Sequence, residues 1–298
     1  MKKYFVFIVV AFISCTVPMP AVVIQTDYGT KDGAVAEMKG VILSVDPSLH
    51  VFDITHEIPQ YNIWEAAYRL NQAAPYWPKG TVFVSVVDPG VGTERKSVVL
   101  KTRSGHYFIS PDNGTLTLVA KDLGIAEIRE IDETKNRRKG SQGSNTFHGR
   151  DVYAYTAARL AAHIIPFDKV GKKLSKQVVS IDYQDAALSN GTISGNIPVL
   201  DIQYGNVWTN IPDSLIKKAG WNYGQDLSIE IFNQDSSVYK DHVILSKTFG
   251  SVPEGSSLAY FNSLMNFSLA INQGSFSDKY KIYSGPEWSI RISTFKNQ

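Results

Sequence analysis

The sequence predicts an α/β domain followed by a smaller antiparallel β domain. Over residues 21–188, runs of almost uninterrupted apolar residues alternate with segments of helical periodicity. Continuous apolar strands are typical of a largely parallel sheet covered by helices. Over residues 189–298, Gly, Asn, Ser and Asp separate short alternating runs, a pattern that favours a small barrel-like or sandwich domain. The overall composition, 43% hydrophobic and 19% charged, excludes wholesale disorder, collagen and coiled coil.

The first elements of the α/β domain follow one another in a regular order. Residues 22–27 (VVIQTD) read as a buried strand that ends in polar residues, and the helix-compatible segment 34–45 follows. A second strand is predicted at 51–54, after a turn that contains proline. Apolar residues recur at helical spacing over 63–74. The β-branched run TVFVSVV at 81–87 predicts a third strand.

The later elements carry weaker patterns. Strands are predicted at 97–101 and 107–110, and helices at 115–123 and 152–163. In the second domain, short alternating runs such as 192–197 and 227–231 predict antiparallel strands.

Charge and cysteine content exclude several classes of function. The 298-residue chain has 30 Lys and Arg against 28 Asp and Glu, and two of the basic residues, Lys2 and Lys3, lie in its first fourteen positions. The remainder is neutral, so no surface for nucleic acid or an anionic membrane is predicted. The single cysteine excludes a disulfide framework and a metal site built from several cysteines.

Residues 1–20 are predicted to be a signal peptide and a short tether. Two lysines precede an apolar run at 4–13, which is shorter than the 20 or so residues that span a bilayer. Cys15 follows after a single serine, an arrangement that resembles a bacterial lipoprotein signal, in which this cysteine is lipidated. A plain cleaved signal with an incidental cysteine is the alternative. We therefore expect an exported protein that touches a membrane only through its lipid anchor.

Polar residues that follow the predicted strands are site candidates, because ligands of α/β sheets bind at the carboxyl ends of strands. Asp27 can accept two hydrogen bonds from a diol such as that of a ribose, although either Asp27 or Asp32 also suits the cap of the next helix. Asp88 and Arg95 flank a loop with two glycines. An ion pair between them would orient an ionised carboxylate for chemistry or simply close the loop.

Two further clusters combine polar and aromatic residues. His148 stands beside Gly149, where a backbone can approach a ligand closely, and it is either catalytic or an ordinary histidine. Asn206 lies near Tyr204 and Trp208, which suits an adenine edge with ring stacking, or a hairpin turn with core aromatics. His56 and the residue after it lack the second histidine of a zincin helix, so no metal is assigned.

These segments together resemble the S-adenosylmethionine hydroxide adenosyltransferases, a family that includes fluorinase and chlorinase branches. The resemblance rests on VDPGVGT at 87–93 and TFHGRD at 146–151, with THEIP at 55–59 and GTVF at 80–83, and it keeps motif order from about residue 22 to about 290. It implies hydrolysis of S-adenosylmethionine to adenosine and methionine, without a cofactor. It also implies a homotrimer whose sites lie between the first domain of one subunit and the second domain of the next.

The resemblance implies a role for each candidate residue. The hydrolytic branch carries an Asp-Arg-His set that matches Asp88, Arg95 and His148, and the halogenating branch lacks it. Asp27 matches the ribose-diol ligand, and Asn206 matches the adenine contact. The other implied substrate-binding positions are Asp32 and Ser263 near the methionine part, Tyr61 beside the sugar, and Thr146, Phe147, Gly149, Tyr204, Trp208 and Asn272. One position departs from the family pattern: Leu264 stands where the halogenases have an arginine that binds the methionine carboxylate.

Two alternatives to hydrolysis stay open. Halide transfer to the same ribose carbon is disfavoured by Asp88, whose carboxylate would repel a halide. The other alternative is a surface lipoprotein that binds adenosine or its derivatives without catalysis. The predicted export favours it, since S-adenosylmethionine is chiefly intracellular, whereas the complete Asp-Arg-His set favours the enzyme.

Overall fold

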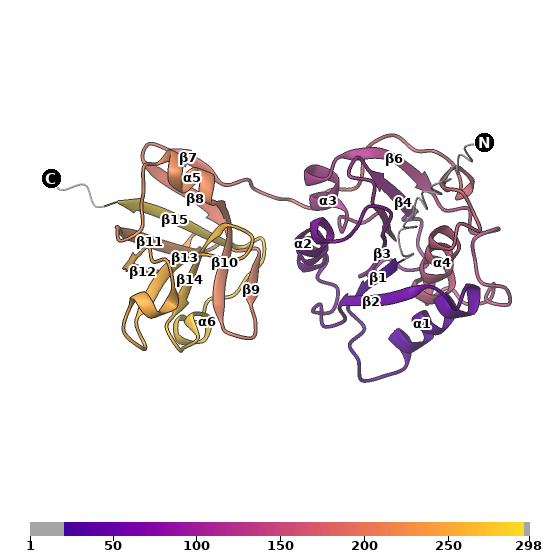
Figure 1. Cartoon of the computed structure of the whole chain (residues 1–298), viewed down its shortest axis with the longest axis horizontal. Helices are drawn as coiled ribbons and strands as arrows, with labels where there is room; N and C mark the ends of the chain where they lie inside the picture. Colours follow the sequence, from indigo (N-terminus) through magenta and orange to yellow (C-terminus); the bar gives the residue numbers. More distant parts are fainter. Residues whose placement is uncertain (1–20, 295–298) are drawn as a thin grey trace, which may run out of the picture.

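The computed structural model describes residues 21–294 of the chain. The predicted signal peptide, its tether and Cys15 lie outside these residues. Within the described part, no helix has both the length and the apolar character needed to cross a membrane. The chain forms two domains joined by an extended segment, with the α/β domain at the right of Figure 1 and the β domain at the left.

The first domain is built on a six-stranded sheet with the order β2-β1-β3-β5-β4-β6. The strands β2, β1, β3 and β5 run parallel, and β4 is antiparallel to both of its neighbours. The predicted largely parallel sheet is therefore confirmed. The strands are β1 (Ala21–Thr26), β2 (His50–Thr55), β3 (Val82–Val86), β4 (Ser97–Thr102), β5 (Tyr107–Pro111) and β6 (Ile125–Glu130). The sequence analysis did not predict β6, in which three of the six residues are charged.

Helices cover both faces of this sheet. They are α1 (Ala34–Val45), α2 (Ile63–Ala73), α3 (Thr117–Asp122) and α4 (Tyr155–Ala161), with a π-helical turn, η2 (Gly149–Ala154), directly before α4. Short 3-10 turns lie at Ala74–Tyr76 and Phe167–Lys169. The two-residue period of a strand sends Val22 and Ile24 into the core beneath α1 and α4, and Val23 into the core beneath α2 and α3.

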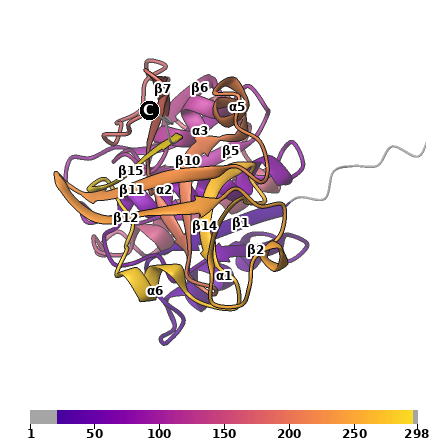
Figure 2. The same cartoon turned by 90° about the vertical axis from the view of Figure 1, so that its left-hand side faces the viewer.

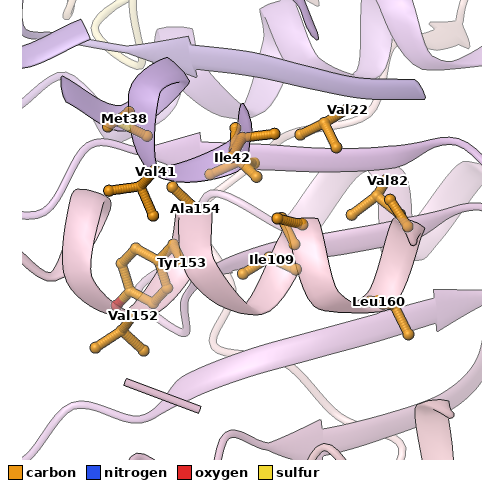
Figure 3. Packing of buried hydrophobic residues seen from close by; sticks show 14 of the residues in the cluster. Val22, Met38, Val41, Ile42, Val82, Ile109, Val152, Tyr153, Ala154 and Leu160 are labelled. Carbon is orange, nitrogen blue, oxygen red and sulfur yellow. The ribbon is translucent and has the colours of Figure 1, made fainter. Parts of the chain in front are cut away.

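The core beneath α1 and α4 fixes the start of η2. In Figure 3, Val41 and Ile42 of α1 lie beside Ala154 of η2, and Met38 of α1 and Val152 of η2 belong to the same buried cluster. Burying each such side chain contributes roughly 1.5–3 kcal/mol. The packing therefore holds the loop before η2, which carries the predicted His148, against the carboxyl ends of the strands.

The second domain consists of two antiparallel sheets, ordered β13-β14-β10-β9 and β12-β11-β15-β8-β7. The antiparallel character that the sequence predicts is confirmed, but the barrel-like arrangement is not, since the strands form two sheets. In Figure 2 this domain lies in front of the first. The elements are β7 (Ala187–Ser189), β8 (Thr192–Asn196), β9 (Val199–Asp201), β10 (Asn206–Pro212), α5 (Asp213–Lys218), β11 (Asp226–Asn233), β12 (Ser236–Ile244), a 3-10 turn (Phe249–Ser251), β13 (Ser257–Phe261), β14 (Asn266–Ile271), α6 (Phe276–Tyr280) and β15 (Trp288–Thr294).

Side chains of α2 connect the two domains. The indole nitrogen of Trp64 donates to the carbonyl oxygen of Pro198 at 3.1 Å, and Arg69 Nη2 donates to that of Leu200 at 2.9 Å. The boundary expected between residues 188 and 189 falls inside β7, which pairs with β8 of the second domain.

Candidate active site

A cavity of about 310 Å³ lies at the carboxyl ends of β1 and β3 in the first domain. This is where an α/β sheet is expected to bind a ligand. Six of the predicted site residues line it, together with Tyr28, Ala34, Gln60 and Val91. The six are Asp27, Asp32, Tyr61, Asp88, Thr146 and Gly149.

The two aspartates after β1 have different local partners. Asp27 Oδ2 accepts a hydrogen bond from the backbone N–H of Tyr61 at 3.0 Å, which holds Tyr61 in a left-handed conformation (φ 64°) with 68% of its surface exposed. Asp27 Oδ1 remains an acceptor for a ligand hydroxyl. Asp32 Oδ1 accepts from the N–H of Ala34, the first residue of α1, at 2.9 Å. Asp32 thus helps to satisfy the start of the helix, although Gly33 occupies the N-cap position, and it also borders the cavity.

Asp88 and Arg95 form a bidentate pair. Arg95 Nε donates to Asp88 Oδ1 at 2.9 Å, and Nη2 donates to Oδ2 at 2.5 Å. Their side chains are only 5% and 11% exposed, so water screens the pair little. Burial lowers the pKa of Arg95, but its hydrogen bonds to Asp88 together with the electrostatic effects of Tyr153, Asp88 and Glu133 outweigh this and raise the pKa. An ionised carboxylate is therefore held in one orientation at the wall of the cavity.

His148 lies behind this pair rather than in the cavity lining. Its Nδ1 is 3.1 Å from Arg95 Nη2, and its Nε2 is 3.1 Å from Nη2 of a second arginine, Arg137. Arg137 in turn donates to Glu133 Oε2 at 2.6 Å. The geometry brings the predicted Asp-Arg-His set together as a chain of contacts, with Asp88 as the member that borders the cavity.

Tyr28 is a cavity residue that the sequence analysis missed. Its pKa is raised by burial and by the charges of Asp27 and Asp88, so its hydroxyl keeps its proton and can donate. Gly149 permits this placement, because a Cβ there would lie 2.6 Å from the Tyr28 oxygen. Phe147 supports Tyr28 edge-on, with ring centroids 5.7 Å apart. A tyrosine next to the predicted Asp27 was the only signal available in the sequence.

The remaining predicted residues line a second cavity, of about 720 Å³, in the β domain. They are Tyr204, Asn206, Trp208, Ser263 and Asn272. Asn206 Nδ2 donates to Asp201 Oδ2 at 3.0 Å, and Trp208 Nε1 donates to the Tyr260 hydroxyl at 3.2 Å. Burial raises the Tyr260 pKa to about 12. Asp201 and Tyr260 also line this cavity, and the sequence analysis missed both.

The two cavities share no lining residue. The first offers carboxylates and a phenol, and the second offers aromatic faces with an amide. Together these groups suit a nucleoside, because carboxylates accept from sugar hydroxyls and the aromatic and amide groups stack on and pair with a base. Within residues 21–294, no group of three or more His, Cys, Asp or Glu side chains is placed to hold a metal ion.

Comparisons with known proteins find relatives over most of the chain. A curated relative from Methanocaldococcus jannaschii, named (R)-S-adenosyl-L-methionine hydrolase, is 35% identical over 86% of this chain and 86% of its own. A fluorinase from Actinopolyspora mzabensis is 30% identical over 92% of this chain and 97% of its own. The crystal structure of an uncharacterized conserved protein from Thermotoga maritima superposes with a TM-score of 0.85 at 34% identity, covering 91% and 99% of the two chains.

Family models cover both domains. The model of the SAM hydroxide adenosyltransferase N-terminal domain matches residues 22–171, and that of the C-terminal domain matches residues 195–289. Together they span most of the described residues, and the cavity of each domain lies within the corresponding match. The chain therefore belongs to the SAM hydroxide adenosyltransferase family.

Proposed function

We propose that this protein hydrolyses S-adenosyl-L-methionine to adenosine and L-methionine. The observation that carries the proposal is the Asp88 carboxylate, held at two points by Arg95 at the wall of the cavity that Asp27 also lines. Asp27 accepts from the ribose hydroxyls and so places C5′ of the sugar near Asp88. No metal or cofactor takes part in the proposed reaction.

The reaction needs alignment and an activated water more than it needs an acid. The water oxygen bonds to C5′ as the bond from C5′ to sulfur breaks, and the sulfur keeps the electron pair and leaves as a neutral thioether. The water loses one proton, and Asp88 is the acceptor that the cavity offers. Arg95 fixes the orientation of Asp88, and the protonated Tyr28 hydroxyl donates to oxygen atoms of the substrate or water.

Halide transfer is the competing reaction, since a fluorinase is among the relatives. It requires an anion to approach C5′, and the ionised Asp88 opposes this by charge repulsion. Water, being neutral, is not opposed, and it can donate a hydrogen bond to the carboxylate. The geometry therefore favours hydrolysis.

Purified protein incubated with each sulfonium epimer of S-adenosylmethionine tests the proposal. Both epimers are needed because a relative is named for the (R) form. Adenosine and methionine in equal amounts are the expected products. 5′-Halo-5′-deoxyadenosine formed in the presence of chloride or fluoride would indicate halide transfer, and binding without any product would indicate a binding protein.

The proposed assembly is a homotrimer in which each active site joins the first cavity of one subunit to the second cavity of a neighbour. Its support is the exposure of large apolar side chains beside both cavities. Tyr61 is 68% exposed at the first, and Tyr204 and Ile202 are 68% and 71% exposed at the second. A subunit interface would cover such side chains.

Gly149→Ala is expected to raise KM by on the order of ten-fold, because the new methyl group displaces the Tyr28 hydroxyl that it would otherwise meet at 2.6 Å. Gly143→Ala is the matched control, since its Cβ meets no atom within 4 Å. Steady-state kinetics of the two variants check the prediction. Equal KM values for both variants would indicate that Tyr28 does not contact the substrate.

The proposed localisation is export with lipidation of Cys15. When the full chain is expressed in a bacterium, we expect it in the membrane fraction, and Cys15→Ala should move it to the soluble fraction, because one thioether-linked lipid group would be its only anchor. Mass spectrometry of the mature N-terminus identifies the lipid. Unchanged membrane fractionation of Cys15→Ala would contradict the proposal.

A further inference from the structure

The loop between β6 and η2 contributes two charged residues to the back of the Asp88–Arg95 pair. Glu133 and Arg137 lie four positions apart in this loop, and neither lines the cavity. The side chains of Arg137 and Glu133 are 12% and 33% exposed. The backbone around them is fixed: Asn136 donates to the carbonyl of Val170 at 2.8 Å, and Thr156 donates to that of Asn136 at 3.1 Å. The loop therefore presents both charges at fixed positions.

Five side chains close a ring of polar contacts. Arg95 Nη1 donates to Ser97 Oγ at 3.1 Å, and Ser97 Oγ donates to Glu133 Oε1 at 3.1 Å. Glu133 Oε2 accepts from Arg137 Nη2 at 2.6 Å. His148 completes the ring, with Nε2 3.1 Å from Arg137 and Nδ1 3.1 Å from Arg95. Asp88 is attached to the ring through Arg95.

The ring determines the charge of His148. A guanidinium group has donors and no acceptor, so a doubly protonated imidazole would direct an N–H at an arginine on each side. The neutral ring has one lone pair and can accept from one arginine. Arg95 and Arg137 are already balanced by Asp88 and Glu133, and His148 is only 6% exposed, so a further positive charge here would be buried without a partner.

We propose that Glu133 and Arg137 are positioning residues: Arg137 keeps His148 in its neutral form against Arg95, Glu133 holds Arg137 in place, and the chain of contacts thereby fixes Asp88. The inference about catalysis rests on the proposed hydrolytic function, whereas the inference about the charge of His148 does not. Neither residue touches the substrate cavity. Their effect passes from Arg137 to His148, from His148 to Arg95, and from Arg95 to Asp88.

The electrostatic surroundings of His148 give the two residues opposite effects. Burial lowers the pKa of His148 below its ordinary value of 6.5, the charges of Arg95 and Arg137 lower it further, and those of Glu133 and Asp88 raise it. The Tyr153 ring lies edge-on at 6.5 Å, and its hydroxyl stays protonated because burial raises its pKa. Removing the charge of Arg137 should therefore raise the pKa of His148, and removing that of Glu133 should lower it.

The test is a direct titration of His148 by NMR in protein labelled at histidine. The chain has six histidines, and the His148 signal is the one missing from His148→Asn. Arg137→Gln is expected to raise the His148 pKa by about one pH unit or more, and Glu133→Gln to lower it. Arg137→Lys keeps the charge and should stay near the parent value. The matched control is Arg129→Gln, which removes an arginine that is 16% exposed, bound to backbone carbonyls and paired with Glu127.

The pH dependence of kcat provides the second measurement. As the pH falls through the folded-state pKa of His148, the ring gains a proton, Arg95 Nη2 keeps Asp88 but loses His148 as an acceptor, and activity falls. The acidic limb should therefore lie below pH 6.5 in the parent protein, move upward in Arg137→Gln and move downward in Glu133→Gln. A purely structural role would lower stability and leave the limb in place.

The two measurements separate the failure of this inference from the failure of the proposed function. Opposite shifts of the His148 pKa in a protein without hydrolytic activity would keep the positioning role and reject the function. Normal hydrolysis with a His148 pKa that neither charge change moves would reject the positioning role. If Arg137→Gln does not fold, the His148 pKa in Glu133→Gln and in Arg137→Lys remains as the test. A lower pKa in Glu133→Gln with an unchanged pKa in Arg137→Lys would support the positioning role, and an unchanged pKa in Glu133→Gln would reject it.

Discussion

Asp88→Asn is expected to lower kcat by about 10²–10⁴-fold and to change KM little. The substitution keeps the shape of the side chain but removes the charge that orients the attacking water and accepts its proton. It also removes one of the two acceptors that Arg95 binds at 2.9 and 2.5 Å. Turnover at saturating S-adenosylmethionine is the measurement, because ground-state contacts of the substrate with Asp27 remain in this variant.

Two comparisons make the Asp88 result specific. Asp53→Asn removes another aspartate that pairs with a basic side chain, Lys39 at 2.6 Å, but at 37% exposure on β2, and turnover should stay normal. Arg95→Gln should impair the same step as Asp88→Asn, so the double variant should lose less than the product of the two single losses. Near-normal turnover of Asp88→Asn would indicate that the ion pair between Asp88 and Arg95 is structural and only closes its loop.

The strands and helices of the first domain could be predicted because their residues carry clear periodicities. The helix predicted at 34–45 is found at Ala34–Val45, and the β-branched run at 81–87 contains β3 (Val82–Val86). The start of α4 could not be predicted, because the π-helical turn before it, Gly149–Ala154, has six residues and is too short to show a periodicity in the sequence. Strand β6 was not predicted, because three of its six residues are charged and suit an exposed segment as well as a strand.

The residues of the candidate site also include some that the sequence predicts and some that it does not. Asp27 and Asp88 follow apolar strands, and such positions meet at one edge of a parallel sheet. Glu133 and Arg137 follow no such rule, because a long loop brings them to the site through its contacts with η2 and α4. Their spacing in the sequence is that of any solvated charge pair, so only the folded loop shows their connection to His148.

A complementation experiment tests the proposed sharing of active sites between subunits. Asp27→Ala removes a carboxylate from the first cavity, and Asn206→Ala removes the amide from the second, so each variant alone should be inactive or nearly so. Native mass spectrometry of isotopically distinct chains verifies that subunits exchange when the two variants are mixed. Each variant carried alone through the same subunit-exchange procedure is the control.

Mixing equal amounts of the two variants should restore activity to about a quarter of the parent level. If a site takes its first cavity from one chain and its second from a neighbour, each half is intact with a chance of about one half, and both are intact in about a quarter of sites. If each site lay within one chain, every site would carry a defect and mixing would restore nothing. The outcome separates the two arrangements without requiring a structure of the assembly. Verified exchange without recovered activity would contradict the shared site, as would full activity in a monomer, and would require the domains of one chain to bring Asp27 and Asn206 together.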